Sequence, residues 1–349
     1  MSIFSRRRDR TPAVVKDASR LAAVGQWRDA IDLLTAANHA QPDPAVEAAL
    51  MDVRHRAFFG GGAGHGPGEW PPPFDDQFPG EAGIPEIDAA DLSVGALRAG
   101  VLGHGALIVR GLLSTAETER LRHIIDTVYA AQDRFQSPDG GTPEAWYREF
   151  SSDINPNIAE LSTFDRYWHR GGAAVLAGDS PRAMFELIDL YHRHGLHHLV
   201  EEYLGEPPAI SVEKTALRRV PYDTLGGWHQ DGAFLGDDIR SLNLWMAATD
   251  CGIDAPTMEM VPVRLHHIVE KGTGDAPYPW AVGDSAAREA AGAIGLVRPH
   301  FREGDAIFFD QMNLHRTSGG PGMTKTRYAV ESWWFAPSHY PNNLIPLLV

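Results

Sequence analysis

The spacing of hydrophobic and polar positions changes after about residue 205 of the 349-residue chain. Before that point apolar residues recur every three or four positions, which is typical of helices that bury one face. After it, short apolar runs are bounded by Gly, Pro or Asp, which is typical of strands. Many short strands with little helix between them favour an antiparallel barrel or jelly roll, with helices on one face, over a parallel sheet. The predicted strands are 106–110, 210–220, 241–249, 258–261, 305–309 and 327–335.

The first 59 residues predict a helical hairpin, because apolar residues recur at helical spacing on both sides of Pro42 and Pro44. The stretch from Gly25 to Ile31 resembles one unit of a tetratricopeptide repeat. A stable array needs about three units, and no second copy is found. We therefore interpret residues 1–59 as a packing appendage; a module that weakly binds a partner protein is the alternative.

A segment rich in Gly and Pro follows, and its composition predicts a linker over 60–91. The chain is thus predicted to consist of an appendage (1–59), this linker and one main domain (92–349). In the main domain, Ser114 and Glu117 have the spacing of a capping box and predict a helix start.

A second helix is predicted from Pro181 to Leu204, with Gly205 as its stop. It carries four histidines. We interpret them as a solvated helix end, and a metal site is the alternative. The histidines are His192, His194, His197 and His198.

Composition excludes several classes of protein. Hydrophobic residues make up 43% and charged residues 22% of the chain, as in globular proteins, and the net charge of -15 opposes binding to nucleic acid or anionic membranes. The single cysteine, Cys251, permits no intramolecular disulfide and no thiolate cage, so a metal must be held by His and carboxylates. No apolar run reaches the roughly 20 residues of a membrane span, and the basic start leads into a polar stretch. We expect a cytoplasmic protein that binds neither nucleic acid nor membrane.

The main candidate for chemistry is the H-x-D sequence from His229 to Asp231. Composition alone predicts about two such matches, so the tripeptide by itself is weak evidence. Its context is stronger, because it follows a predicted strand and a Gly-Gly turn, and His315 follows another strand. Residues i and i+2 of an extended segment point to one side, so His229 and Asp231 can reach a common point that His315 completes. Such a 2-His-1-carboxylate face leaves metal positions open and suits non-haem Fe(II).

Arg327 opens the last long predicted strand, twelve residues after His315. An arginine that enters a barrel interior is costly without an anion, and its planar guanidinium suits a carboxylate. A bound dicarboxylate would satisfy it. A salt bridge at the strand edge is the alternative, which the neighbouring triad disfavours.

From about Leu92 to the C-terminus the sequence resembles the phytanoyl-CoA dioxygenase-like branch of the Fe(II)/2-oxoglutarate oxygenases. Four stretches in order carry the resemblance: the family's opening strand and turn, its metal-binding H-x-D, the strand before its "PGSH" turn, and its distal histidine with its 2-oxoglutarate arginine. They are Gly105 to Ser114, Trp228 to Gly232, Met258 to Pro262, and His315 with Arg327.

This resemblance implies a mainly β protein with flanking helices, built on a double-stranded β-helix of the jelly-roll, cupin-like kind. It implies that His229, Asp231 and His315 bind Fe(II), and that Arg327 pairs with the distal carboxylate of 2-oxoglutarate. Trp245 lies where the family often packs an aromatic ring against the cosubstrate.

Three further positions bear on the cosubstrate. Thr317 matches a family hydroxyl that shares the 2-oxoglutarate carboxylate. Lys214 and Arg218, on the strand that leads to the triad, are candidates to offer positive charge to cosubstrate or substrate, with an outward-facing position as the alternative.

The sequence departs from the family after Pro262, where Gly-Ser-His is replaced by Val263 to His266. The substrate side of that turn is therefore expected to differ. We interpret His266 and His267 as surface side chains rather than a second metal site.

The predicted activity is an Fe(II)/2-oxoglutarate-dependent dioxygenase that uses dioxygen to hydroxylate an unactivated C–H bond of a small organic metabolite, with succinate and CO2 as coproducts. Related halogenases replace the triad carboxylate by a small residue, so Asp231 favours hydroxylation or desaturation. One alternative is a catalytically inactive double-stranded β-helix scaffold that acts as a binding protein. Another is a zinc hydrolase, which the absence of an H-E-x-x-H sequence disfavours.

Overall fold

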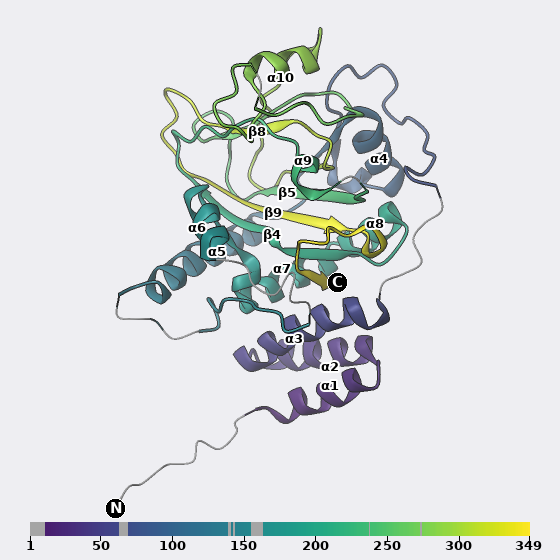
Figure 1. Ribbon diagram of the computed structural model, residues 1–349, viewed down its shortest axis with the longest axis vertical. Helices are drawn as coiled ribbons and strands as arrows, with labels where there is room; N and C mark the ends of the chain where they lie inside the picture. Colours follow the sequence, from purple (N-terminus) through teal and green to yellow (C-terminus); the bar gives the residue numbers. More distant parts are fainter. Residues whose placement is uncertain are drawn as a thin grey trace, which may run out of the picture.

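The computed structural model describes residues 11–62, 69–138, 141, 144–154, 163–236, 238–272 and 274–349. The basic start of the chain and residues 63–68 of the predicted linker lie outside this described part. Figure 1 shows a layer of N-terminal helices at one end, a large sheet in the middle and α10 at the other end. Within the described part, no helix is both long and apolar enough to cross a membrane.

The N-terminal layer has three helices, one more than the predicted hairpin. Gly25 separates the first two with a φ of 80°, and the side chain of Asp43 accepts a hydrogen bond from Ala45 N at the start of the third. The third helix packs on the rest of the protein through Met51, which belongs to the main core. The three helices are α1 (Ala13–Ala23), α2 (Trp27–Ala40) and α3 (Pro44–Ala57).

The large sheet has the order β1-β2-β7-β5-β9-β4-β10, with β3 also paired to β4. Every pair is antiparallel except β1–β2, which is parallel, so the antiparallel prediction holds for the centre of a mixed sheet. Its strands are β1 (Glu86–Asp88), β2 (Ala106–Arg110), β3 (Ala174–Leu176), β4 (Ala209–Val220), β5 (Ser241–Ala247), β7 (Ala306–Phe309), β9 (Arg327–Phe335) and β10 (Pro346–Leu348).

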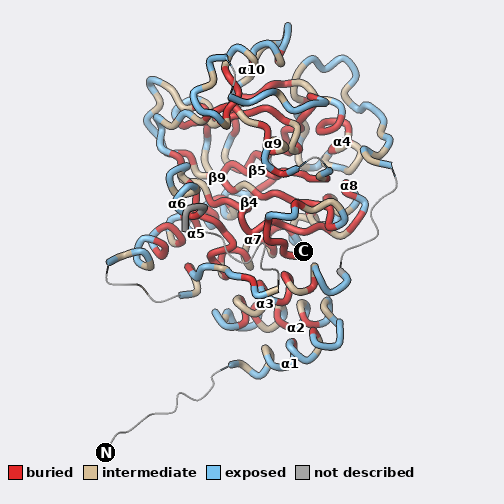
Figure 2. Tube along the Cα trace, in the orientation of Figure 1, coloured by how far each residue is buried: buried red, intermediate tan, exposed pale blue. Residues whose placement is uncertain are grey.

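The two faces of this sheet bury different clusters of side chains, and Figure 2 shows that its central strands are mostly buried. On β9, Val330 and Trp334 pack in the core formed with the helices, whereas Ala329 and Trp333 pack in a second cluster on the opposite face. This alternation follows from the two-residue period of a strand. Arg327 therefore lies on the face that looks away from the helices.

A second, two-stranded sheet is formed by β6 (Thr257–Met260) and β8 (His315–Ser318). Met258 and Met260 of β6 belong to the same cluster as Trp245 and Trp333 of the large sheet. The small sheet therefore packs against the face that carries Arg327, and the space between the two sheets is where the candidate site lies.

The protein contains more helix than the predicted mainly β fold would have, and it is a mixed α/β fold. Residues 181–204 form two helices rather than one, because Gly195 adopts a left-handed φ of 66° between them. The capping box of Ser114 and Glu117 is confirmed. The remaining helices are α4 (Val94–Arg98), α5 (Thr115–Phe135), α6 (Thr163–Gly171), α7 (Pro181–Arg193), α8 (Leu196–Leu204), α9 (Gly232–Leu235) and α10 (Asp284–Ala291). Short 3-10 or π turns are Phe58–Gly62, Ala89–Asp91, Ala99–Gly103, Ala177–Asp179 and Pro337–His339.

Candidate active site

His229 and His315 lie opposite each other in an antiparallel bridge beside the small sheet. Each backbone N–H donates to the carbonyl oxygen of the other residue at 3.0 Å. Because paired residues of a bridge project their side chains to the same face, the two rings lie side by side with centroids 4.5 Å apart. The chain thus brings together two histidines that are 86 positions apart in sequence (315 − 229).

Backbone carbonyls orient both imidazole rings. Nδ1 of His229 lies 3.0 Å from Gly227 O, and Nδ1 of His315 lies 3.2 Å from Asn313 O. Since a carbonyl oxygen can only accept, Nδ1 must carry the proton in each ring. The lone pair of each Nε2 is then free to bind a metal. Burial and the neighbouring His229 lower the pKa of His315 to about 4, which favours its neutral, metal-binding form.

Asp231 completes the group. Its Oδ2 atom lies 3.9 Å from Nε2 of His229 and 3.9 Å from Nε2 of His315. This oxygen is buried and has no hydrogen-bond partner among the described residues. Burial alone would raise the pKa of Asp231, but Lys214 and the two histidines hold it well below its usual range, so the carboxylate is ionised.

The three ligand atoms fit a metal ion. They lie within 4.8 Å of one another, and within the described part of the chain no other group of three or more His, Cys, Asp or Glu residues has this geometry. Two neutral imidazole nitrogens and one carboxylate oxygen on one side of a point form the donor set of non-haem Fe(II) centres. An unpartnered buried oxygen that faces two free nitrogen lone pairs is stabilised by a cation at that point.

Gln230, the middle residue of the H-x-D sequence, was not singled out from the sequence and turns out to anchor the loops around the triad. Its side-chain Nε2 donates to His267 O and Met312 O, and its Oε1 accepts from Val269 N. With 1% of its surface exposed, Gln230 is saturated with hydrogen bonds inside the protein. It links the loop after β6 and the loop before β8 to the metal-binding segment.

Arg327 enters the space between the sheets without a carboxylate partner. Its Nη1 donates to Thr257 O at 3.2 Å and its Nη2 to Thr317 Oγ1 at 3.4 Å, while Nε is buried without a partner. No ion pair with a carboxylate of the described chain is present, which argues against the strand-edge salt bridge. Burial lowers the pKa of Arg327 to about 10, as expected for a cation with no adjacent anion.

Trp245 and Thr317 lie beside this arginine. The guanidinium carbon of Arg327 is 5.5 Å from the centre of the Trp245 ring, which is itself 2% exposed. Both residues line one small cavity together with His229 and His315. Arg327, Trp245 and Thr317 therefore share one space with the two histidines of the triad.

Lys214 and Arg218 both face inward from β4. Lys214 Nζ donates to Asp231 Oδ1 at 2.8 Å, and Arg218 pairs with Glu331 at 2.7 Å. Glu331 was missed from the sequence, although it lies four residues after Arg327 on one strand and period-two spacing places both on one face. Burial opposes its ionisation, but Arg218 lowers the pKa of Glu331 to about 2.

An aromatic wall lies beside His229 of the triad. The ring of Trp280 lies 6.2 Å from that of His229, stacks in parallel on Tyr278 at 5.3 Å and meets Trp168 edge-on at 6.1 Å. A Cβ atom on Gly227 would come within 2.9 Å of the Trp280 ring, so the Gly-Gly turn lets this wall approach. Trp168 and Tyr278 are exposed, and the wall thus forms part of the site's outer rim.

The remaining candidate histidines take no part in this site. His266 and His267 are exposed, as interpreted from the sequence. His194 pairs with Glu117 at 2.9 Å.

The chain is similar to several known proteins. A family model described as phytanoyl-CoA dioxygenase matches residues 102–321, well over half of the chain. A protein named acetate kinase from Rhizobium meliloti is 31% identical over 122 residues; the match covers 34% of this chain, and the chain spans 30% of that protein's length. That coverage is too small to assign a shared family.

Several solved structures are similar at low identity. AviO1 from Streptomyces viridochromogenes Tue57 is 19% identical, with 71% of this chain and 96% of that chain covered and a TM-score of 0.43. EctD from S. alaskensis, solved with 2-oxoglutarate and 5-hydroxyectoine, is 16% identical, with 68% and 74% covered and a TM-score of 0.47. The carbocyclase SnoK from nogalamycin biosynthesis is 16% identical, with 72% and 86% covered and a TM-score of 0.43.

Proposed function

Because the chain belongs to the phytanoyl-CoA dioxygenase family of non-haem Fe(II)/2-oxoglutarate-dependent dioxygenases, we propose that it hydroxylates an unactivated C–H bond of a small organic metabolite. Succinate and CO2 are the coproducts. The observation that carries this proposal is the convergence of two imidazole nitrogens and one unpartnered carboxylate oxygen within 4.8 Å.

In this proposal His229, Asp231 and His315 hold the iron. The two histidines are fixed in the tautomer that presents Nε2, and the carboxylate is kept ionised before the metal arrives. Iron bound with 2-oxoglutarate and dioxygen supplies the oxidising power that turns a C–H bond into a C–OH bond. The presence of Asp231 leaves no ligand position for a halide, which favours hydroxylation or desaturation over halogenation.

Arg327 is proposed to bind the distal carboxylate of 2-oxoglutarate, with the Thr317 hydroxyl as a second donor and Trp245 as a packing surface. The support is that this buried guanidinium lacks a carboxylate partner among the described residues and shares a cavity with His229 and His315. A planar guanidinium forms two parallel hydrogen bonds with a carboxylate, which fixes the cosubstrate's direction as well as its charge. Glu331 is already paired with Arg218 and leaves Arg327 available.

The substrate is proposed to approach along the aromatic wall of Trp280, Tyr278 and Trp168. These rings offer flat apolar faces next to His229 and line the rim of the site rather than its floor. A substrate with an apolar or ring-shaped face would displace water from them on binding, and exclusion of water protects the oxidising centre from side reactions.

We also propose that the two sheets form the double-stranded β-helix of the family. The support is the facing arrangement, in which the large sheet contributes Arg327 and Trp245 and the small sheet contributes His315 and Thr317. The division into an appendage (1–59), a linker (60–91) and an oxygenase domain (92–349) stays a prediction.

The decisive experiment measures succinate release by the purified protein with Fe(II), 2-oxoglutarate and dioxygen, with and without a panel of small metabolites. The proposal requires succinate formation that depends on all three components and rises with a substrate. The inactive-scaffold and zinc-hydrolase alternatives require that 2-oxoglutarate is not consumed, and this result would refute the proposal.

A further inference from the structure

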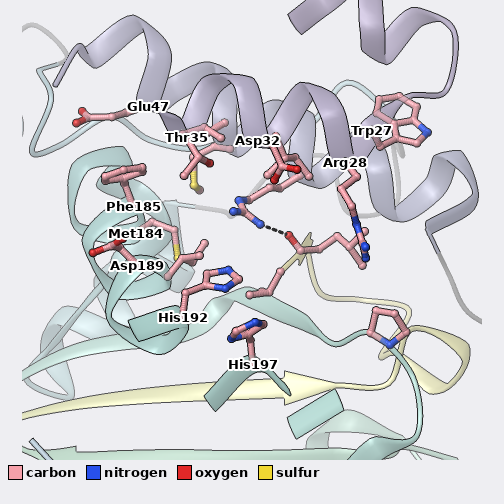
Figure 3. Close-up of a pocket in the computed structure, with 18 of the residues that line it drawn as sticks. Trp27, Arg28, Asp32, Thr35, Glu47, Met184, Phe185, Asp189, His192 and His197 are labelled. Atoms are coloured by element: carbon pink, nitrogen blue, oxygen red, sulfur yellow. Dashed lines mark hydrogen bonds between the residues drawn. The ribbon is translucent and has the colours of Figure 1, made fainter. Parts of the chain in front are cut away.

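A cavity of about 640 Å³ lies between the N-terminal helices and helices α7 and α8, and it shares no lining residue with the cavity beside His229 and His315. Figure 3 shows Trp27, Asp32 and Thr35 of α2 on one side of it and Met184 and His192 of α7 on the other. Its volume falls within the range of about 300 to 1,000 Å³ that is usual for small-molecule sites.

The cavity contains a buried cation that the described chain leaves unneutralised. Arg54 of α3 lines it with 6% of its surface exposed, and its one hydrogen bond runs from Nη1 to Leu348 O at 2.8 Å. None of the described carboxylates lies within ion-pair distance of its guanidinium. Asp32, which acts on Arg54 only at longer range, is exposed to solvent.

Two other buried arginines have the carboxylate partner that Arg54 lacks. Arg166 pairs with Asp179 at 2.7 Å, and Arg316 pairs with Glu259 at 2.7 Å. Arg54 instead resembles Arg327, the proposed cosubstrate arginine, since both are buried without a carboxylate partner among the described residues and burial lowers the pKa of each to about 10. A buried charge without a partner is costly, so a position of this kind is suited to an external anion.

The acids around the cavity are mostly engaged elsewhere. Glu47 pairs with Arg182 and accepts from Asn38, and Asp189 pairs with His39 at 2.8 Å. They therefore do not supply the missing partner of Arg54.

Neutral polar groups and an apolar wall make up much of the remaining lining, which also includes Arg28, which is exposed, and Glu201, which lies 3.7 Å from His198. Burial, His197 and Arg54 lower the pKa of His192 to about 4, so its imidazole is uncharged at neutral pH. Thr35 Oγ1 is buried without a partner among the described residues. The rest of the surface is largely hydrocarbon or aromatic, from Trp27, Ile31, Leu50, Met51, Met184, Phe185 and Ile188.

We propose that this cavity binds an organic carboxylate with an apolar body, whose carboxylate pairs with Arg54 and whose body packs between α2, α3 and α7. The site is independent of the proposed oxygenase chemistry, because it shares no residue with the triad or with Arg327. Arg28 also lines the cavity but is exposed to solvent, whereas Arg54 is buried. One buried guanidinium favours a single anionic group over a dicarboxylate.

The test is isothermal titration calorimetry of the full chain with decanoate, with saturating 2-oxoglutarate present. Decanol, which has the same body and no charge, and acetate, which has the charge and no body, are run beside it. We expect saturable binding of decanoate that is stronger than that of either analogue. Arg54→Gln should weaken decanoate binding roughly tenfold or more, the scale expected for truncating one partner of a buried charged pair, and should leave decanol unaffected.

Three further variants make the result interpretable. Arg56→Gln is the matched control, since Arg56 lies on the same helix, outside the cavity, and pairs with Asp52 and Asp153; its decanoate binding should be unchanged. Thr35→Phe fills the cavity while keeping Arg54, and should also weaken binding. Decanoate binding that is absent, or that is unchanged in Arg54→Gln, would overturn the proposal, and its loss in Arg327→Gln would place the binding at the proposed oxygenase site instead.

Discussion

Lys214 Nζ donates a hydrogen bond of 2.8 Å to Asp231 Oδ1, while Oδ2 of the same carboxylate faces His229 and His315. One oxygen is thus held by an ammonium and the other is presented to the proposed metal position. Partners of this kind set the orientation of a ligand as well as its charge. We therefore propose that Lys214 positions Asp231, in addition to any contact it makes with cosubstrate.

Lys214→Gln should weaken Fe(II) binding by about 10- to 100-fold, the range for losing the hydrogen-bond partner of a metal ligand. The amide can still donate a hydrogen bond but no longer stabilises the ionised carboxylate. Iron binding is measured by equilibrium dialysis, and the 2-oxoglutarate requirement by succinate release at saturating iron.

Lys325→Gln is the control, because Lys325 is an exposed lysine that pairs with Asp254. It should leave both quantities unchanged. If Lys214→Gln raises only the 2-oxoglutarate requirement and not the iron requirement, Lys214 acts on the cosubstrate and its positioning role is refuted.

Asp231→Asn and Asp231→Ala should both abolish turnover and weaken Fe(II) binding, since each removes the site's only carboxylate ligand. They should differ in stability. The Asn side chain keeps an oxygen that accepts a hydrogen bond from Lys214, whereas Ala leaves a largely buried ammonium without a partner. Asp231→Ala should therefore lower the free energy of unfolding by about 1 to 3 kcal/mol more than Asp231→Asn. Urea unfolding compares the two variants. Normal turnover in either one would remove Asp231 from the metal site.

Much of the site could be predicted because its residues lie at strand ends with a recognisable order. His229, Asp231 and Arg327 follow or begin strands whose apolar runs are clear in the sequence. β8 was missed because its four residues, His315 to Ser318, are polar. They are a strand because β6 pairs with them, and that pairing is a tertiary contact with no local signal.

The place of Lys214 could not be predicted, because β4 changes register between Ile210 and Thr215. Uniform alternation would put Lys214 on the same face as Ile210 and Val212, which pack against the helices. The irregularity shifts the alternation by one position, so that Lys214 faces Asp231 instead. A bulge of this kind depends on the partner strands rather than on the residues of one strand.

His55 should make the protein less stable in mild acid. It is buried between Pro346 O and Ser152 Oγ, and burial lowers its pKa in the folded state. Below about pH 6.5 the unfolded chain takes up a proton that the folded protein resists. The free energy of unfolding should therefore fall as pH decreases from about 6.5, by at most about 1.4 kcal/mol per pH unit from this group.

Urea unfolding at a series of pH values checks this. His55→Gln should flatten the acid slope, whereas His266→Gln, at an exposed histidine, should leave it as it is. An unchanged slope in His55→Gln would assign the acid sensitivity to other groups.

Deletion of residues 1–59 should leave Fe(II) binding in place but lower the melting temperature. The removed helix α3 carries Arg54 and His55, which donate to the carbonyls of Leu348 and Pro346 in β10. β10 pairs with β4, which carries Lys214. The deletion therefore removes contacts that stabilise the sheet but removes no proposed metal ligand. A melting curve and iron dialysis of the shortened chain give the result, and loss of all iron binding would refute the domain boundary.

Arg327→Ala should raise the 2-oxoglutarate requirement by the equivalent of about 2 to 5 kcal/mol, the range for truncating one partner of a buried charged pair. Iron affinity should stay nearly constant, because Arg327 contacts Thr257 and Thr317 and none of the proposed ligands. Arg327→Lys should recover only part of the loss, since an ammonium cannot form the two parallel hydrogen bonds of a guanidinium. Succinate release is measured against 2-oxoglutarate concentration, with a melting curve for each variant. A structural role alone would lower the melting temperature and leave the 2-oxoglutarate requirement unchanged, and that outcome would rule out the cosubstrate role.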